Sequence, residues 1–171
     1  MVERKDWTDT LLDSWAELEP EFSVEAYQVT ARISRLALHV AQREERVFGR
    51  FGLNRGEVGV LSALRIAEPP HQLSPTKLFR GLMLSSAGIT NRLDRLEKRG
   101  LVRRTRDPND RRGVLVELTE DGRTVLDQAV RANTMAELDL VSGLDAGERK
   151  SLGALLKKML ADLEAPGDVN T

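Results

Sequence analysis

The chemistry that this sequence can offer is concentrated between Arg92 and Arg112, where nine basic side chains stand against four acidic ones. The whole chain carries a net charge of −1, so this segment is a local excess of positive charge. Arginine and lysine bind phosphate groups, and arginine and asparagine also make paired hydrogen bonds to guanine and adenine. The distribution of charge therefore predicts a surface that binds nucleic acid, although the overall composition gives no such sign.

Polar side chains follow one face of a helix predicted over residues 85–99. Ile89, Leu93 and Leu96 recur at helical spacing and predict a buried face, and Gly100 ends the helix. Hydroxyl groups near a helix N-terminus can bind phosphate, whereas asparagine and arginine can form hydrogen bonds with base edges. A surface helix with solvated charges would show the same pattern. The residues of this helix that we expect to contact DNA are Ser85, Ser86, Thr90, Asn91, Arg95 and Lys98.

Two β-rich runs follow, over residues 101–106 and 113–118, separated by an Asp-Pro-Asn-Asp turn. This pattern predicts a β-hairpin with an arginine-rich tip. Arginine at such a tip suits the negative potential of a narrow minor groove, so Arg111 and Arg112 are expected to contact DNA. Asp110 is expected to pair with Arg112 and orient it. The alternative for this segment is a solvated turn with an ordinary surface ion pair.

Two shorter helices are predicted before the one over residues 85–99. Asn54, with a glutamate three residues later, is typical of a helix start, and Pro69-Pro70 ends this first helix. Ser74, followed directly by proline, starts the second helix. Two helices joined by a short glycine-bearing turn and followed by a β-hairpin predict a winged helix-turn-helix over residues 54–118.

Long predicted helices flank this unit over residues 23–51, 119–140 and 145–163, and a short helix starting at Asp6 precedes them. The last helix carries leucines and one methionine in a stripe at helical spacing, and such a stripe must be covered. A seam between two subunits is the favoured cover, and packing within the chain against the helix over residues 23–51 is the alternative.

The fold class that follows is mostly α with a small β-hairpin wing, in which a winged helix-turn-helix head is carried on a helical dimerisation framework. Residues 1–53 are expected to form an appended helix and a long dimerisation helix. Residues 54–118 are expected to form the DNA-binding head, and residues 119–171 the C-terminal dimerisation helices. The absence of a signal-like or membrane-length apolar run predicts a cytoplasmic protein with no membrane partner.

The sequence shows none of the residue groupings that catalysis or a metal site requires. Its two histidines, His39 and His71, are far apart, and it has no cysteine, no glycine-rich phosphate loop and no nucleophile motif. We therefore expect a protein that is not an enzyme, with no catalytic residue, no metal and no cofactor. Because folds do not dictate function, a winged-helix protein–protein adaptor without a ligand response remains the alternative to a DNA-binding regulator.

Three segments carry a family resemblance: residues 89–102, residues 107–113 with the sequence Asp-Pro-Asn-Asp-Arg-Arg-Gly, and residues 118–122 with Leu-Thr-Glu-Asp-Gly. In these segments the chain resembles the MarR (multiple antibiotic resistance regulator) family of winged-helix repressors. The resemblance implies a homodimer that binds a pseudo-palindromic operator in double-stranded DNA and is released by a ligand. It also implies that Asp110 orients the wing and that Arg112 reaches the minor groove.

Trp15, in the first predicted helix, extends the resemblance to the urate-responsive subgroup of that family. The subgroup implies ligand-binding roles for Trp15, for Arg92 and for Arg104. Arg92 lies on the helix over residues 85–99, which is the recognition helix in this family, and Arg104 lies on the first strand of the wing, residues 101–106. Gly59 departs from the pattern because an aspartate is expected there, and its loss removes a hydrogen-bond acceptor and a negative charge. A small aromatic anion is then the expected effector. Alternatively, the tryptophan is a core anchor and the two arginines bind phosphate or lie on the surface.

Overall fold

The protein is described by a computed structural model, which places residues 5–19, 21, 23–81, 86–108, 110 and 113–164. Helices dominate these residues, and three short strands form one small sheet, in agreement with the predicted fold class. The elements in chain order are α1 (Trp7–Leu18), α2 (Val24–Gly49), α3 (Arg55–Ile66), β1 (Gln72–Leu73), α4 (Pro75–Gly81), α5 (Ser86–Lys98), β2 (Val102–Arg106), β3 (Val114–Leu118), α6 (Glu120–Leu140) and α7 (Ala146–Leu163).

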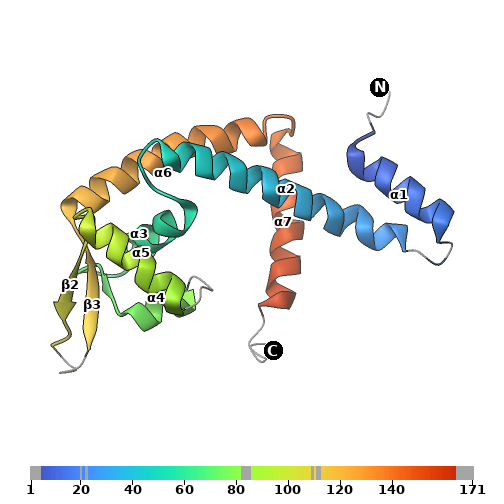
Figure 1. The fold of residues 1–171 in the computed structure, drawn as a ribbon. Helices are drawn as coiled ribbons and strands as arrows, with labels where there is room; N and C mark the ends of the chain where they lie inside the picture. The colour runs from blue at the N-terminus through green and yellow to red at the C-terminus, as the bar shows by residue number, and fades with distance from the viewer. Residues whose placement is uncertain are drawn as a thin grey trace.

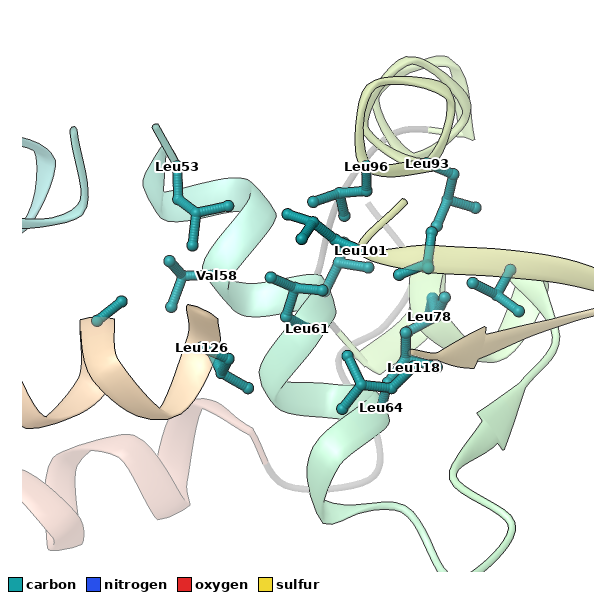
Figure 2. Packing of buried hydrophobic residues seen from close by; sticks show 14 of the residues in the cluster. Leu53, Val58, Leu61, Leu64, Leu78, Leu93, Leu96, Leu101, Leu118 and Leu126 are labelled. Atoms are coloured by element: carbon teal, nitrogen blue, oxygen red, sulfur yellow. The ribbon is translucent and has the colours of Figure 1, made fainter. Parts of the chain in front are cut away.

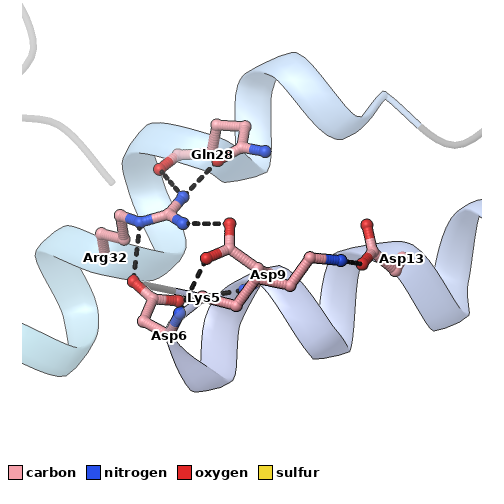
Figure 3. Close-up of polar contacts among 6 residues, drawn as sticks. All are labelled: Lys5, Asp6, Asp9, Asp13, Gln28 and Arg32. Atoms are coloured by element: carbon pink, nitrogen blue, oxygen red, sulfur yellow. Dashed lines mark hydrogen bonds and ion pairs between the residues drawn. The ribbon is translucent and has the colours of Figure 1, made fainter. Parts of the chain in front are cut away.

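The first helix, α1, is fixed to α2 by charged side chains (Figure 3). Asp6 caps α1, because its carboxylate accepts a hydrogen bond of 3.0 Å from the backbone N–H of Asp9. The Asp9 carboxylate accepts one of 2.8 Å from the backbone N–H of Asp6 in return. Arg32 of α2 then binds both carboxylates, at 3.0 Å for Asp6 and 2.6 Å for Asp9. Beneath this polar contact, Thr8 and Leu12 are buried.

The helices of the head start and end where the sequence predicts. The side chain of Asn54 accepts a hydrogen bond of 2.9 Å from the backbone N–H of Glu57, which caps α3. The hydroxyl of Ser74 accepts one of 3.3 Å from the N–H of Lys77 at the start of α4. After α5, Gly100 has a φ of +71°, the left-handed conformation that commonly terminates helices and that glycine adopts without strain.

The wing is a three-stranded antiparallel sheet with the strand order β1-β3-β2. β2 and β3 form the predicted hairpin. β1 adds a third strand on the other side of β3, with Gln72 opposite Glu117 and Leu73 opposite Val116. The sequence did not predict β1, because two residues are too few to show an alternating pattern.

The head has a continuous apolar core centred on α3 (Figure 2). Val60, Leu61 and Leu64 of α3 are completely buried. Figure 2 shows Leu96 of α5 on one side of α3 and Leu126 of α6 on the other. Because α3 contacts the recognition helix, the wing and α6 at once, it determines how these elements lie relative to one another.

The remaining helices build an extended framework (Figure 1). α6 runs beside α2, and Arg43 of α2 binds the carboxylate of Asp139 at 2.6 Å and the carbonyl of Ala136 at 3.2 Å. α1 lies at the end of α2 that is far from the head, and α7 projects away from α2 and α6. Every residue of α7 is exposed in the single chain, so α2 does not cover the predicted apolar stripe. Among the described helices, none combines the length and apolarity needed to cross a membrane.

Candidate nucleic-acid interface

The recognition helix α5 turns its apolar residues into the head and its polar residues outward. Ile89, Leu93 and Leu96 are buried, as the sequence predicts. The side chain of Ser86, at the first position of α5, and all of Ser85 lie outside the described part of the structure. The other predicted DNA contacts of this helix are exposed: Thr90, Asn91, Arg95 and Lys98.

Arg95 is the one of these side chains that an ion pair links to the interior of the head. Its side chain is 63% exposed, and its Nε lies 3.1 Å from Oε1 of Glu57, a residue with no exposed side-chain surface. Glu57 was noted in the sequence for its place at the start of a helix. Its approach to Arg95 depends on how α3 and α5 pack, and no local pattern reports that packing.

Arg104 on β2 ties the wing to the recognition helix. Its Nη2 lies 2.6 Å from Oδ1 of Asp94, and its Nη1 forms a second ion pair with Glu97. The backbone N–H of Arg104 also donates to Glu97 at 3.1 Å. Both acidic partners belong to α5, so the orientation of the wing and that of the recognition helix are coupled through this arginine.

Arg99, just beyond α5, links the recognition helix to the end of α2. Its guanidinium donates hydrogen bonds to the backbone carbonyls of Phe51 and Gly52. Gly52 has a φ of +67° and turns the chain from α2 toward α3. A rotation of the head against α2 must therefore stretch or break these hydrogen bonds.

The turn of the wing is tight at its base. The backbone N–H of Gly113 donates to the carbonyl of Asp110 at 2.9 Å, and the N–H of Asp107 donates to the carbonyl of Gly113 at 3.0 Å. A Cβ atom at Gly113 would lie 2.8 Å from that of Asp107, so a larger residue requires the turn to shift. Arg111 and Arg112 lie outside the described residues, and the pairing of Asp110 with Arg112 stays a prediction.

A cross-strand ion pair stabilises the wing behind its tip. Arg103 of β2 faces Glu117 of β3, with Nη2 at 2.6 Å and Nε at 2.9 Å from the two carboxylate oxygens. Gln72 of β1 donates a further hydrogen bond of 3.0 Å to Glu117. The hydrogen bond from Arg103 holds the pKa of Glu117 below its usual range.

Arg92, a predicted ligand-binding residue, lies in a cavity of about 560 Å³ where α2, α3 and α5 meet. Its side chain crosses Gly56 so closely that a Cβ atom there would lie 2.2 Å from Nε of Arg92. Glu44 of α2 forms an ion pair with Arg55 of α3 in the wall of the same cavity. The lining residues are Glu44, Phe48, Arg55, Gly56, Val58, Gly59 and Arg92.

Trp15, the second predicted ligand-binding residue, does not reach this cavity within one chain. It lines a different hollow of about 380 Å³ between α1 and α2, together with Leu11, Leu12 and Tyr27. Arg104, the third, is occupied by its ion pairs with α5. The three predicted residues are thus in three different surroundings in the single chain.

The described residues contain no group of three or more histidine, cysteine, aspartate or glutamate side chains arranged to hold a metal ion. The chemistry that these side chains do offer is cationic and hydrogen-bonding, with the exposed face of α5 at its centre. Such a face can bind a polyanion and read base edges.

Comparison with known proteins gives a consistent result. The sequence profile of the MarR family matches residues 51–113. The chain is 31% identical to the HTH-type transcriptional regulator PecS of Dickeya dadantii (strain 3937) over 87% of its own length and 90% of that protein. It is 35% identical to the HTH-type transcriptional repressor NicR of Pseudomonas putida, over 82% of its own length and 90% of that protein.

Solved structures show the same likeness. A MarR family transcriptional regulator from Streptomyces coelicolor, solved in complex with DNA, is 26% identical with a TM-score of 0.76, and the match covers 86% of this chain and 96% of that one. BpsR of Bordetella bronchiseptica is 29% identical with a TM-score of 0.61, over 75% of this chain and 98% of that one. The BpsR structure concerns the regulation of DNA binding by 6-hydroxynicotinic acid.

Proposed function

This chain belongs to the MarR family of DNA-binding transcriptional regulators, and we propose that it is a homodimeric repressor released from its operator by a small aromatic anion. It is a regulator and not an enzyme. The observation that carries the proposal is the exposed polar face of α5, which stands on a closed apolar core beside a wing that is tied to it by Arg104.

In this proposal, α5 enters the major groove and the wing enters the adjacent minor groove. Asp110 is proposed to orient the wing. The residues assigned to DNA are Ser85, Ser86, Thr90, Asn91, Arg95, Lys98, Arg111 and Arg112. Residues 54–118 then act as the reading head. The two heads of a dimer must place their recognition helices about 34–36 Å apart to reach successive major grooves on one face of DNA.

The framework, residues 1–53 and 119–171, is proposed to hold two subunits together. Support comes from α7, which exposes a stripe of apolar side chains that the other described elements leave open to solvent. A continuous apolar stripe that is exposed along a whole helix is typical of a protein–protein interface. The stripe consists of Leu152, Leu155, Leu156, Met159, Leu160 and Leu163.

The effector site is proposed to be the cavity around Arg92. Its position suits a switch, because α2 belongs to the framework while α3 and α5 belong to the head, so a ligand bound between them changes the spacing of the two heads. Arg92 offers a positive charge and Phe48 an apolar wall, whereas Gly59 offers no carboxylate to accept ligand N–H groups. These features favour a flat aromatic carboxylate, the chemical class of the compound named for BpsR.

Trp15 can contribute to that cavity only from the partner subunit. Within one chain it packs near Tyr27, and Tyr27 and Glu44 are separated by seventeen residues of α2, which is about 26 Å at 1.5 Å per residue. In the proposed dimer the partner's α1 would supply the tryptophan. Arg104 is proposed to respond indirectly, since a shift of α5 alters its ion pairs with Asp94 and Glu97.

A fluorescence-polarisation titration against the intergenic DNA upstream of the protein's own gene tests the proposal. We expect affinity to fall about 1,000-fold or more between about 50 and 200 mM salt if six or more phosphates are contacted. An aromatic carboxylate, tested in a panel that includes urate and 6-hydroxynicotinic acid, should release the DNA.

Arg92→Ala should abolish the response to that compound, while the control Arg50→Ala, at the exposed end of α2, should keep it. A response that survives in Arg92→Ala contradicts the assigned effector site. No binding of duplex DNA at low salt contradicts the repressor and favours the protein–protein adaptor.

A further inference from the structure

The charge of one buried carboxylate in the head is not explained by helix capping. Glu57 has no exposed side-chain surface, and among the described residues it and Thr8 are the buried polar ones. An ionised carboxylate without a partner is costly in such surroundings. Its Oε2 accepts a hydrogen bond of 3.0 Å from the backbone N–H of Asn54, and this bond completes the cap of α3.

The cap does not require a negative charge. Glutamine serves at this position of a capping box as well as glutamate does, because one side-chain oxygen is enough. The second oxygen of Glu57, Oε1, is buried and has no hydrogen bond of good geometry among the described residues. Its near neighbour is Nε of Arg95 at 3.1 Å, so the charge of Glu57 is directed at the recognition helix.

Arg95 keeps most of its donors while Glu57 holds it. A guanidinium carries five N–H groups, one on Nε and four on Nη1 and Nη2. The contact with Glu57 uses the Nε edge, and the side chain remains 63% exposed. The pair of Nη donors, which makes the bidentate contact to guanine O6 and N7, is therefore left for a ligand outside the head.

The other described arginines near this face are used differently. Both Nη atoms of Arg104 form ion pairs, one with Asp94 and one with Glu97. Both Nη atoms of Arg99 donate hydrogen bonds to backbone carbonyls. Arg92 crosses Gly56 and lines the cavity beside α2. Arg95 combines a fixed Nε edge with an exposed outer end.

We propose that Glu57 is a positioning residue for DNA recognition, which holds the Nε edge of Arg95 so that its Nη1 and Nη2 donors meet a guanine in a preset orientation. The inference rests on the proposed function, in which α5 enters the major groove. A side chain that is ordered before binding loses less conformational freedom on binding, and this raises the affinity. Because it is Arg95 that is ordered in this way, the increase in affinity depends on the base pair that Arg95 contacts.

The test measures affinity for the operator and for a panel of operators in which each base pair of a half-site is replaced in turn. Glu57→Gln keeps the capping oxygen and removes the charge. We expect it to weaken binding to the intact operator about tenfold, the range of a single bidentate base contact. On the operator whose Arg95 base pair is replaced, Glu57→Gln should behave like the wild type.

Arg95→Lys supplies the second half of a double-mutant cycle. It keeps a positive charge beside Glu57 but has no fork of donors. We expect Arg95→Lys to lose the same base preference, and Glu57→Gln to cause no further loss in the Arg95→Lys background. Lys98→Ala is the matched control and should weaken binding evenly over the whole panel, as a phosphate contact does.

The outcomes separate this inference from the proposed function. Equal weakening of every operator by Glu57→Gln, or losses that add in the double variant, overturns the positioning role while DNA binding stands. Absence of DNA binding by the wild type overturns the proposed function itself. If Glu57→Gln fails to fold, the wild type still decides. Nitrogen-15 relaxation of the Arg95 Nε signal, assigned by its loss in Arg95→Lys, should show a more ordered side chain than that of exposed Arg50, and equal order overturns the inference.

Discussion

In the reading head, Val60, Leu61 and Leu64 of α3 are completely buried, whereas in α7 Leu155 and Leu163 are 62% and 73% exposed. Both helices carry apolar residues at the same helical spacing, so the periodic pattern does not tell which surface will cover it. The head closes its core within one chain. The framework leaves its apolar stripe for a second surface.

The two regions also differ in what joins their elements. The apolar core centred on α3 extends into α2 and α6 through Val47, Phe48, Leu126 and Ala129, whereas α1 is joined to α2 by the ion pairs of Arg32 beside the buried Leu12. Ion pairs near the surface contribute little stability compared with a closed apolar core. We therefore expect the head to unfold together with the parts of α2 and α6 that pack on it, and α1 and α7 to respond separately to substitution.

The largest expected effect comes from placing charge on the uncovered stripe. Leu155→Glu together with Leu156→Glu should raise the dissociation constant of the dimer about 100-fold or more, because burying each leucine contributes about 1.5–3 kcal/mol. Sedimentation equilibrium measures this constant. Lys150→Glu with Lys157→Glu, away from the stripe on the same helix, is the matched control. A double leucine variant that dimerises like the control would show that the stripe is not the seam.

Removing a buried side chain from the core of the head should lower the stability of the fold. Leu64→Ala is expected to lower the free energy of unfolding by about 2–5 kcal/mol, since the side chain is fully buried. Ile66→Ala, two residues away and 84% exposed, should cost about 0.5 kcal/mol or less. Denaturant unfolding of both variants provides the comparison, and similar losses would contradict a closed apolar core in the head.

A smaller effect is expected at the contact between α1 and α2. Arg32→Ala removes the partner of Asp6 and Asp9, and amide exchange in α1 should rise by about fivefold at most, the equivalent of about 1 kcal/mol. Hydrogen-exchange mass spectrometry should show no change in α3 or α5. Faster exchange throughout the head would mean that the two regions are coupled more tightly than their contacts indicate.

The smallest effect is a pH dependence in the wing. The pKa of Glu117 is lowered in the folded protein by its hydrogen bond from Arg103, so this residue stabilises the fold above its unfolded pKa of about 4.3. The contribution is lost as pH falls through the lower, folded pKa. The difference in Tm between the wild type and Glu117→Gln should thus be greatest near neutral pH and shrink below about pH 4. A difference that is constant with pH would refute the ionic origin.

Local signals in the sequence predicted most of the elements. Asn54, Ser74 and Thr119 mark helix starts with side chains that accept hydrogen bonds from the first turn, and all three do so in the structure. Gly100 marks a helix end for an equally local reason. The short strand β1 was missed, because its pairing with β3 is set by residues more than forty positions away.

The candidate site was predicted less completely. The outward face of α5 follows from helical periodicity, and the structure places its described residues outward. The sequence did not predict the ion-pair partners at this site. Glu57 of α3 lies beside Arg95 of α5, and Asp94 and Glu97 of α5 lie beside Arg104 of β2. Each ion pair joins two elements. The spacing of residues along one helix or strand does not show which other element packs against it.

By itself, then, the sequence determined where helices begin and end, which faces are apolar and where positive charge gathers, because these properties depend on neighbours within a few positions. Only the tertiary structure decided that Arg92 faces a cavity beside α2, that Trp15 lies at the far end of that helix and that a buried glutamate lies beside Arg95. Such facts depend on the packing of distant segments, which is set by the shape of the whole core.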